Sequence, residues 1–135
     1  MPRIPQSLVL EGPAATSAEA RDVASQFVAH MCPWAETEAV VLVVAELVAN
    51  AARHTRGPWR LSLWAHLGEL RIGVEDSSSD PPVGRAPDLA GGGGFGWHLV
   101  HRLAHHVLVI GLPQGKRVEA RWEAPHRGGE PVRRP

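Results

Sequence analysis

A chain of 135 residues with 44% hydrophobic content is long enough for one domain with a sizeable core and too short for two. Its fourteen basic and fourteen acidic residues give zero formal net charge, which argues against nucleic acid or an anionic membrane as the main partner. The only cysteine, Cys32, excludes an internal disulfide and a cysteine-based zinc site. The N-terminus lacks the apolar core of a signal peptide, and no apolar run reaches the roughly 18 to 20 residues of a membrane helix, so we expect a cytoplasmic protein.

The first part of the chain predicts one strand and two helices. A short apolar run over residues 7–11 predicts the strand. Thr16 or Ser17 is a suitable N-cap for a helix that runs to about Met31. A long run of helix-forming apolar residues predicts the second helix over residues 36–54.

The second part predicts two hairpins separated by a helix. Alternating apolar and polar residues predict strands over 59–67 and 69–75, and a helix that begins near Gly96 precedes strands over 106–112 and 117–123. Residues 76–94 contain almost nothing apolar, which is typical of a lid, a binding loop or disorder.

This order of elements predicts an α+β fold, a two-layer α/β sandwich. We expect a mixed, mostly antiparallel sheet with about three helices on one face and the other face partly open. Residues 7–124 form the domain in this prediction. The Pro, Gly and Arg content of residues 125–135 predicts a disordered tail.

Two polar residues interrupt the apolar run of the second predicted helix. Glu46 and Asn50 are four residues apart, so their side chains are neighbours on one helix face. A buried polar group without a partner costs about 1 to 3 kcal/mol, which predicts a polar partner or ligand at this face. The alternative is that both residues lie at the solvent-facing edge of the helix.

Three groups of residues together form the pattern of a nucleotide site: the pair Glu46 and Asn50, the carboxylate Asp76, and a run of glycines. The amide oxygen of Asn50 is a hard ligand suited to Mg²⁺, and Glu46 could polarise a water or a hydroxyl for attack on a terminal phosphate. Asp76, which follows a predicted strand, is suited to accept a hydrogen bond from the exocyclic amine of adenine. The glycines of residues 91–94 and Gly96 precede a helix, and their backbone N–H groups could approach phosphate closely.

These segments resemble the GHKL superfamily of ATP-binding domains, and within it the bacterial anti-sigma-factor serine/threonine kinases. Residues 46–54 match the N box, residues 76–82 match the G1 box and residues 94–100 match the G2 box. The resemblance implies ATP and Mg²⁺ as ligands, with Glu46 as the catalytic base and Asn50 as the magnesium ligand. The nucleotide-binding positions it implies are Asn50, Arg53, His54, Asp76, Ser78, Gly92, Gly93, Gly94, Phe95 and Gly96.

The chain departs from that family at two positions near the adenine. Ser78 stands where the G1 box usually has glycine, and Arg117 stands where a threonine often follows Gly-Lys on a late strand. Ser78 is compatible with the site if the loop does not need a positive φ there, and Arg117 is compatible if its side chain points outward.

The resemblance implies a regulator that has two alternative protein partners. Such proteins bind a sigma factor, phosphorylate a STAS-type anti-sigma-factor antagonist on a serine or threonine, and commonly form homodimers. The alternative is a non-catalytic regulator of the same fold that acts by protein binding alone. Histidine kinases share the ATP site, but the sequence shows no helical module to carry a phosphoacceptor histidine.

Histidines and tryptophans allow two further hypotheses, which we do not favour. His101 and His105 are one helical turn apart and lie near His98 and His106, a spacing that could hold a metal, but no carboxylate or cysteine nearby completes the set. The five tryptophans are scattered without the spacing of a base-stacking platform, so we assign them to packing.

Overall fold

The computed structural model describes residues 6–54, 57–78 and 96–125. Its elements follow the predicted order, and their bounds differ from the predicted ones by at most two residues. They are β1 (Gln6–Gly12), α1 (Ser17–Met31), α2 (Thr37–His54), β2 (Trp59–His66), β3 (Glu69–Asp76), α3 (Gly96–Leu103), β4 (His106–Leu112) and β5 (Gly115–Glu123). Most of the predicted lid and nearly all of the predicted tail lie outside the described residues.

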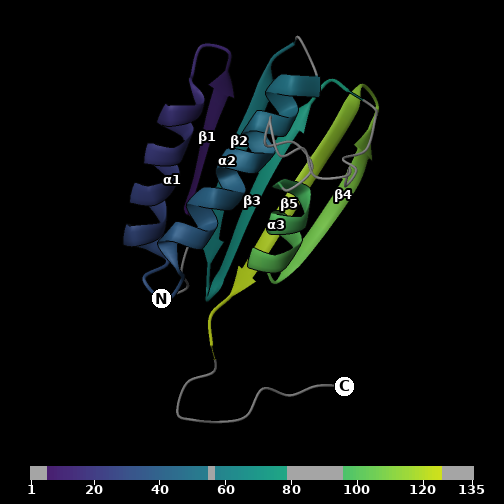
Figure 1. The fold of residues 1–135 in the computed structure, drawn as a ribbon. Helices are drawn as coiled ribbons and strands as arrows, with labels where there is room; N and C mark the ends of the chain where they lie inside the picture. Colours follow the sequence, from purple (N-terminus) through teal and green to yellow (C-terminus); the bar gives the residue numbers. More distant parts are fainter. Residues whose placement is uncertain (1–5, 55–56, 79–95, 126–135) are drawn as a thin grey trace.

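The five strands of the described residues form one sheet in the order β1-β2-β3-β5-β4, and the three helices described with them pack on one face (Figure 1). This arrangement confirms the predicted α+β two-layer sandwich. All four pairings between the described strands are antiparallel, so no parallel pair contributes to the sheet there. None of the described helices is long and apolar enough to cross a membrane.

The core lies between the sheet and the helices because the strands alternate in polarity. In β2 the residues Trp59, Leu61, Leu63 and Ala65 are buried, and each intervening residue is partly or fully exposed. Leu63 pairs with Leu8 on one side and Ile72 on the other, so apolar side chains meet across the sheet. Burial of one such side chain stabilises the fold by about 1.5 to 3 kcal/mol.

Helix α1 begins with a capping box. The Thr16 hydroxyl accepts a hydrogen bond from the Glu19 N–H at 3.1 Å, and the Glu19 carboxylate accepts one from the Thr16 N–H at 2.9 Å. Two backbone donors that the helix leaves open are thereby satisfied, which is worth about 1 kcal/mol. Thr16 is therefore the N-cap, which is one of the two residues that the sequence predicted for this position.

The outer face of the sheet carries a charged network where the sequence predicted a partly open surface. Arg117 donates hydrogen bonds to Glu75 at 3.2 Å and to Glu119, and Arg121 donates one to Glu119 at 2.7 Å. Burial by itself would raise the pKa of Glu119, but the hydrogen bonds and charges of Arg121 and Arg117 outweigh burial and hold this pKa below its usual value. The network covers Glu119, which is only 6% exposed to solvent.

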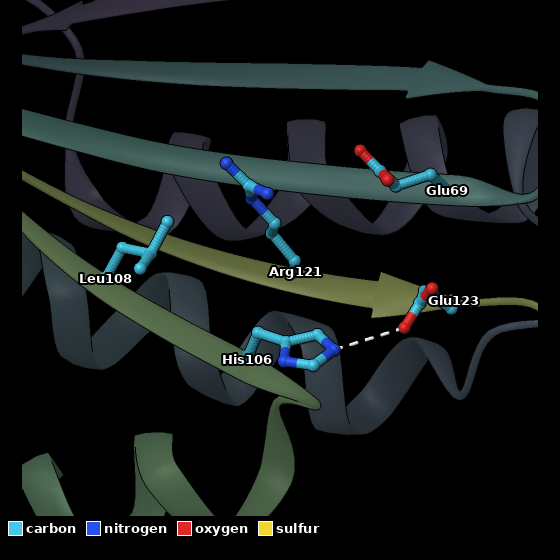
Figure 2. A pocket seen from close by; sticks show the side chains of 5 residues that line it. All are labelled: Glu69, His106, Leu108, Arg121 and Glu123. Atoms are coloured by element: carbon cyan, nitrogen blue, oxygen red, sulfur yellow. Dashed lines mark hydrogen bonds and ion pairs between the residues drawn. The ribbon is translucent and has the colours of Figure 1, made fainter. Parts of the chain in front are cut away.

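A shallow hollow lies at the edge of the same outer face (Figure 2). Its lining comes from β3, β4 and β5, and the His106 ring and the Glu123 carboxylate are 3.1 Å apart across it. Glu69 of β3 and Arg121 of β5 also line the hollow (Figure 2). Because these side chains point away from the helices, the hollow is on the opposite side of the sheet from Glu46 and Asn50.

Candidate functional site

Helix α2 places Glu46 and Asn50 at the border between the core and the surface. Leu47, Val48 and Ala51 on the same helix are buried, whereas Glu46 and Asn50 are half-buried. Leu42, one turn before Glu46, is 47% exposed. The polar pair therefore lies on a face of α2 that is only partly covered, between the apolar side of the helix and its solvent-facing edge.

The Glu46 carboxylate lies against the first residue of α3. A Cβ placed on Gly96 would lie 2.0 Å from Glu46 Oε2 and 2.8 Å from its Cδ, which is a severe overlap. Only glycine therefore fits at position 96 while Glu46 keeps its place. The start of a helix favours a neighbouring negative charge, so this position suits the carboxylate electrostatically as well.

Asp76 ends strand β3 with its side chain toward the helix layer. Leu70, Ile72 and Val74 alternate with outward residues along β3, and Asp76 continues the inward set. The start of β2 lies beside the end of β3, since Leu61 pairs with Val74, and α2 ends shortly before β2 begins. The C-terminal end of α2, which carries Asn50, is therefore at the same end of the sandwich as Asp76 (Figure 1).

Lys116 of β5 makes the principal contact of the Asp76 carboxylate. Its Nζ donates to both Oδ1 and Oδ2 at 3.0 Å, and the two side chains are only 6% and 4% exposed. Oδ1 also accepts a hydrogen bond from the Ser78 backbone N–H at 2.8 Å. Ser78 thus contributes its backbone to the site, which is compatible with serine in place of glycine.

Gly115 permits the close approach of β5 to the end of β3. Its φ is +156°, and a Cβ at this position would lie 1.9 Å from the Asp76 carbonyl oxygen. The residue that follows, Lys116, stands directly opposite Asp76 in the register of the two strands. A glycine at the start of β5 therefore sets the pairing that joins Lys116 to Asp76.

Arg117 is on the other face of the sheet from Asp76. Its guanidinium lies over Gly73 and contacts Glu75 and Glu119 on the outer surface. The sequence had marked Arg117 as the departure near the adenine, with an outward side chain as the favourable case, and that case is found. The residue that contacts Asp76 is Lys116, which lies outside the predicted strand over 117–123 because β5 begins two residues earlier, at Gly115.

The other predicted nucleotide residues are placed only in part. Arg53 is exposed near the end of α2, and His54 is the last residue of that helix. Gly96 is the first residue of α3. The remaining predicted positions, Gly92, Gly93, Gly94 and Phe95, lie outside the described residues.

The described residues suit Mg·ATP in their chemistry. Mg²⁺ prefers oxygen ligands and usually shares its coordination with waters and phosphates, so a single amide oxygen such as that of Asn50 is an adequate protein ligand. Within the described part of the chain, no three His, Cys, Asp or Glu residues are grouped so as to hold a metal by themselves. A second hollow, between β1 and α1, does not include Glu46, Asn50 or Asp76.

The histidines near α3 make contacts other than those of a metal site. His105 Nδ1 accepts a hydrogen bond from the Glu123 backbone N–H at 3.0 Å, and His106 pairs with the Glu123 carboxylate. The His101 ring packs edge-on against Trp97 with 4.6 Å between ring centroids. The first two contacts join the start of β4 and the residue before it to β5, and the third lies within α3.

The comparison with known families agrees with this geometry. The family model of the histidine kinase-like ATPase domain matches residues 11–122, which include α2, Asp76 and the start of α3. No curated protein matches the chain. Because the match covers most of the 135 residues, the chain belongs to the histidine kinase-like ATPase domain family, whose members are ATP-binding domains of the GHKL type.

Proposed function

We propose that this protein is an ATP-binding anti-sigma factor and serine/threonine-protein kinase. It binds a sigma factor and phosphorylates a STAS-type antagonist, using Mg·ATP. The observation that carries the proposal is the position of Glu46, a half-buried carboxylate with Asn50 one turn away, set against Gly96 at the start of α3. A domain that only bound nucleotide would have no need for a base at this position.

Asn50, Asp76 and Glu46 each have one task in this proposal. Asn50 holds Mg²⁺, which neutralises charge on the phosphates when it is bound. Asp76 accepts a hydrogen bond from the adenine amine. Glu46 orients the hydroxyl of the substrate serine or threonine and accepts its proton.

The proposed transfer balances without any further reactant. The bond between the terminal phosphorus of ATP and the bridging oxygen breaks, and ADP leaves with that electron pair. The hydroxyl oxygen of the substrate forms the new bond to phosphorus, and its proton moves to Glu46. The task of the protein is therefore positioning and proton transfer.

One observation favours the alternative, a non-catalytic regulator. The carboxylate that would hold adenine is already bound by Lys116 at 3.0 Å through both of its oxygens. A domain in which this ion pair closed the base site would keep the fold and act by contact with its partners alone. Direct nucleotide binding separates the two functions.

A homodimer completes the proposal, and the free edge of β1 supports it. The outer edge of β1 pairs with no other described strand, and Leu8 and Val9 on it are 37% and 56% exposed. The hollow between β1 and α1 adds the exposed Met31 to this apolar surface. Exposed apolar groups along a strand edge favour contact with a second chain.

Phosphotransfer tests the proposed activity. The purified protein is incubated with Mg²⁺, ATP labelled at its terminal phosphate, and each purified STAS-domain protein of the source organism. Wild-type protein is expected to label one of them on serine or threonine, and Glu46→Gln is expected to lower the labelling rate at least about a hundredfold while ATP still binds. Glu38→Gln, an exposed carboxylate in the first turn of the same helix, is the matched control. Full transfer by Glu46→Gln would remove the base assignment.

A further inference from the structure

The buried Asp76–Lys116 pair retains hydrogen-bonding capacity for a ligand. A carboxylate offers about four acceptor positions. Among the described contacts, Oδ1 accepts from Lys116 and from the Ser78 N–H, whereas Oδ2 accepts from Lys116 alone. Oδ2 therefore keeps an acceptor position beside the ammonium group.

Lys116 also keeps a donor that is only weakly engaged. Its Nζ is 3.0 Å from both carboxylate oxygens of Asp76, whereas its contact with the Ser78 carbonyl oxygen is 3.4 Å long. A hydrogen bond of that length is weak compared with one near 2.9 Å. The pair thus presents two groups next to each other: an acceptor position on Asp76, and a Lys116 donor whose weak hydrogen bond a ligand can replace.

Adenine carries the complementary arrangement. Its exocyclic amine is a donor, and it is flanked on both sides by ring acceptors, N1 and N7. A pose in which the amine donates to Asp76 Oδ2 on the side of the ammonium group therefore brings a ring nitrogen close to Lys116 Nζ, which is 3.0 Å from that oxygen.

We propose that Lys116 reads the base directly, by donating a hydrogen bond to the adenine ring nitrogen beside the amine that Asp76 binds. This inference rests on the proposed nucleotide site and assigns a specificity role that the motif residues do not supply. The two side chains are almost fully buried, and the positive charge of Lys116 balances the negative charge of Asp76 when no nucleotide is bound. The ion pair is then part of the base site and does not block it.

Nucleotide analogues test this role on the unmodified protein. Calorimetric titration compares ATP with 1-deaza-ATP and 7-deaza-ATP, in which a C–H group replaces N1 or N7. One of the two analogues is expected to bind the wild-type protein about tenfold or more weakly than ATP, because the lost hydrogen bond has a charged donor. The identity of the analogue that binds more weakly shows whether the N1 edge or the N7 edge of adenine faces Lys116.

Variants assign the lost hydrogen bond to Lys116. In Lys116→Met, ATP and both analogues should bind with the same affinity, and in Lys116→Arg, which keeps a charged donor, the penalty for the sensitive analogue should return in part. Arg117→Met is the matched control, because it removes the adjacent cation from the outer face and should leave the ranking of the three nucleotides unchanged.

The outcomes separate this role from the proposed function. Equal affinity of wild-type protein for ATP and both analogues would overturn the role of Lys116 and leave the ATP site standing, as would an unchanged penalty in folded Lys116→Met. Tighter ATP binding by Lys116→Met would show that the ion pair blocks the base site. Absence of ATP binding by wild-type protein would overturn the proposed function and this inference together.

Discussion

The carboxylate of Glu46 occupies the space that any side chain at position 96 would need. Gly96 begins α3, and Glu46 lies in the middle of α2, so the contact joins two residues whose positions in the sequence are 50 apart (96 − 46). The predicted base is thus held against the start of the helix that follows the glycine run. The site geometry depends on the absence of a Cβ at this one position.

Substitution of Gly96 by alanine tests that contact. Gly96→Ala should displace the Glu46 carboxylate, and because this carboxylate is the far end of a flexible, half-buried side chain, the cost in the free energy of unfolding should be at the low end for overpacking, about 1 kcal/mol. In a Glu46→Ala background, the same substitution should cost little or nothing, since the overlapping atoms are gone. Urea unfolding of the four proteins measures the coupling, and an equal cost in both backgrounds would contradict the contact.

The buried ion pair should show strong coupling in stability. Asp76→Ala leaves the Lys116 charge buried without its partner, and it should lower the free energy of unfolding by about 3 to 5 kcal/mol. Addition of Lys116→Met should recover a large part of this loss, because the pair is then replaced by neutral groups. Additive effects of the two substitutions in urea unfolding would show that the pair is not formed in solution.

Glu119 should make stability depend on pH in a defined direction. Its pKa in the folded protein lies below the ordinary value of 4.5, so its contribution is present above that value and is lost as the pH falls through the folded pKa. Glu119→Gln should therefore lower the free energy of unfolding by about 1 kcal/mol at neutral pH. This difference from wild type should shrink toward pH 3.

Urea unfolding of both proteins from pH 7 to pH 3 measures the effect. Glu38→Gln serves as the control, because Glu38 is exposed and forms no such network among the described residues. A difference between Glu119→Gln and wild type that grew on acidification would contradict the assigned sign.

The fold could be predicted from the sequence because the spacing of hydrophobic residues and the helix start and stop signals agree along most of the chain. Thr16 as N-cap, the alternation through Leu61 and Leu63, and the hairpin at Gly68 each have a local cause that is visible in the sequence. These local signals leave few alternatives for the order of elements.

The contacts of the site could not be predicted from the sequence in the same way, because they join residues that are distant in sequence. Lys116 faces Asp76 across 40 residues, and this depends on the register of β3 with β5 and on where β5 begins. The contact of Glu46 with Gly96 depends on the packing of two helices. Periodicity in a single chain contains no direct signal for either contact.

Titration with ATP is the measurement that tests the central claim most directly. Calorimetry of the wild-type protein with ATP, with and without Mg²⁺, is compared with Asn50→Ala and with Gln26→Ala, an exposed amide on α1. The account predicts that wild type and Gln26→Ala bind ATP in a Mg²⁺-dependent manner and that Asn50→Ala loses this binding. Absence of ATP binding by the wild-type protein even at millimolar concentrations would contradict the account and would favour a domain of this family that acts by protein contact alone.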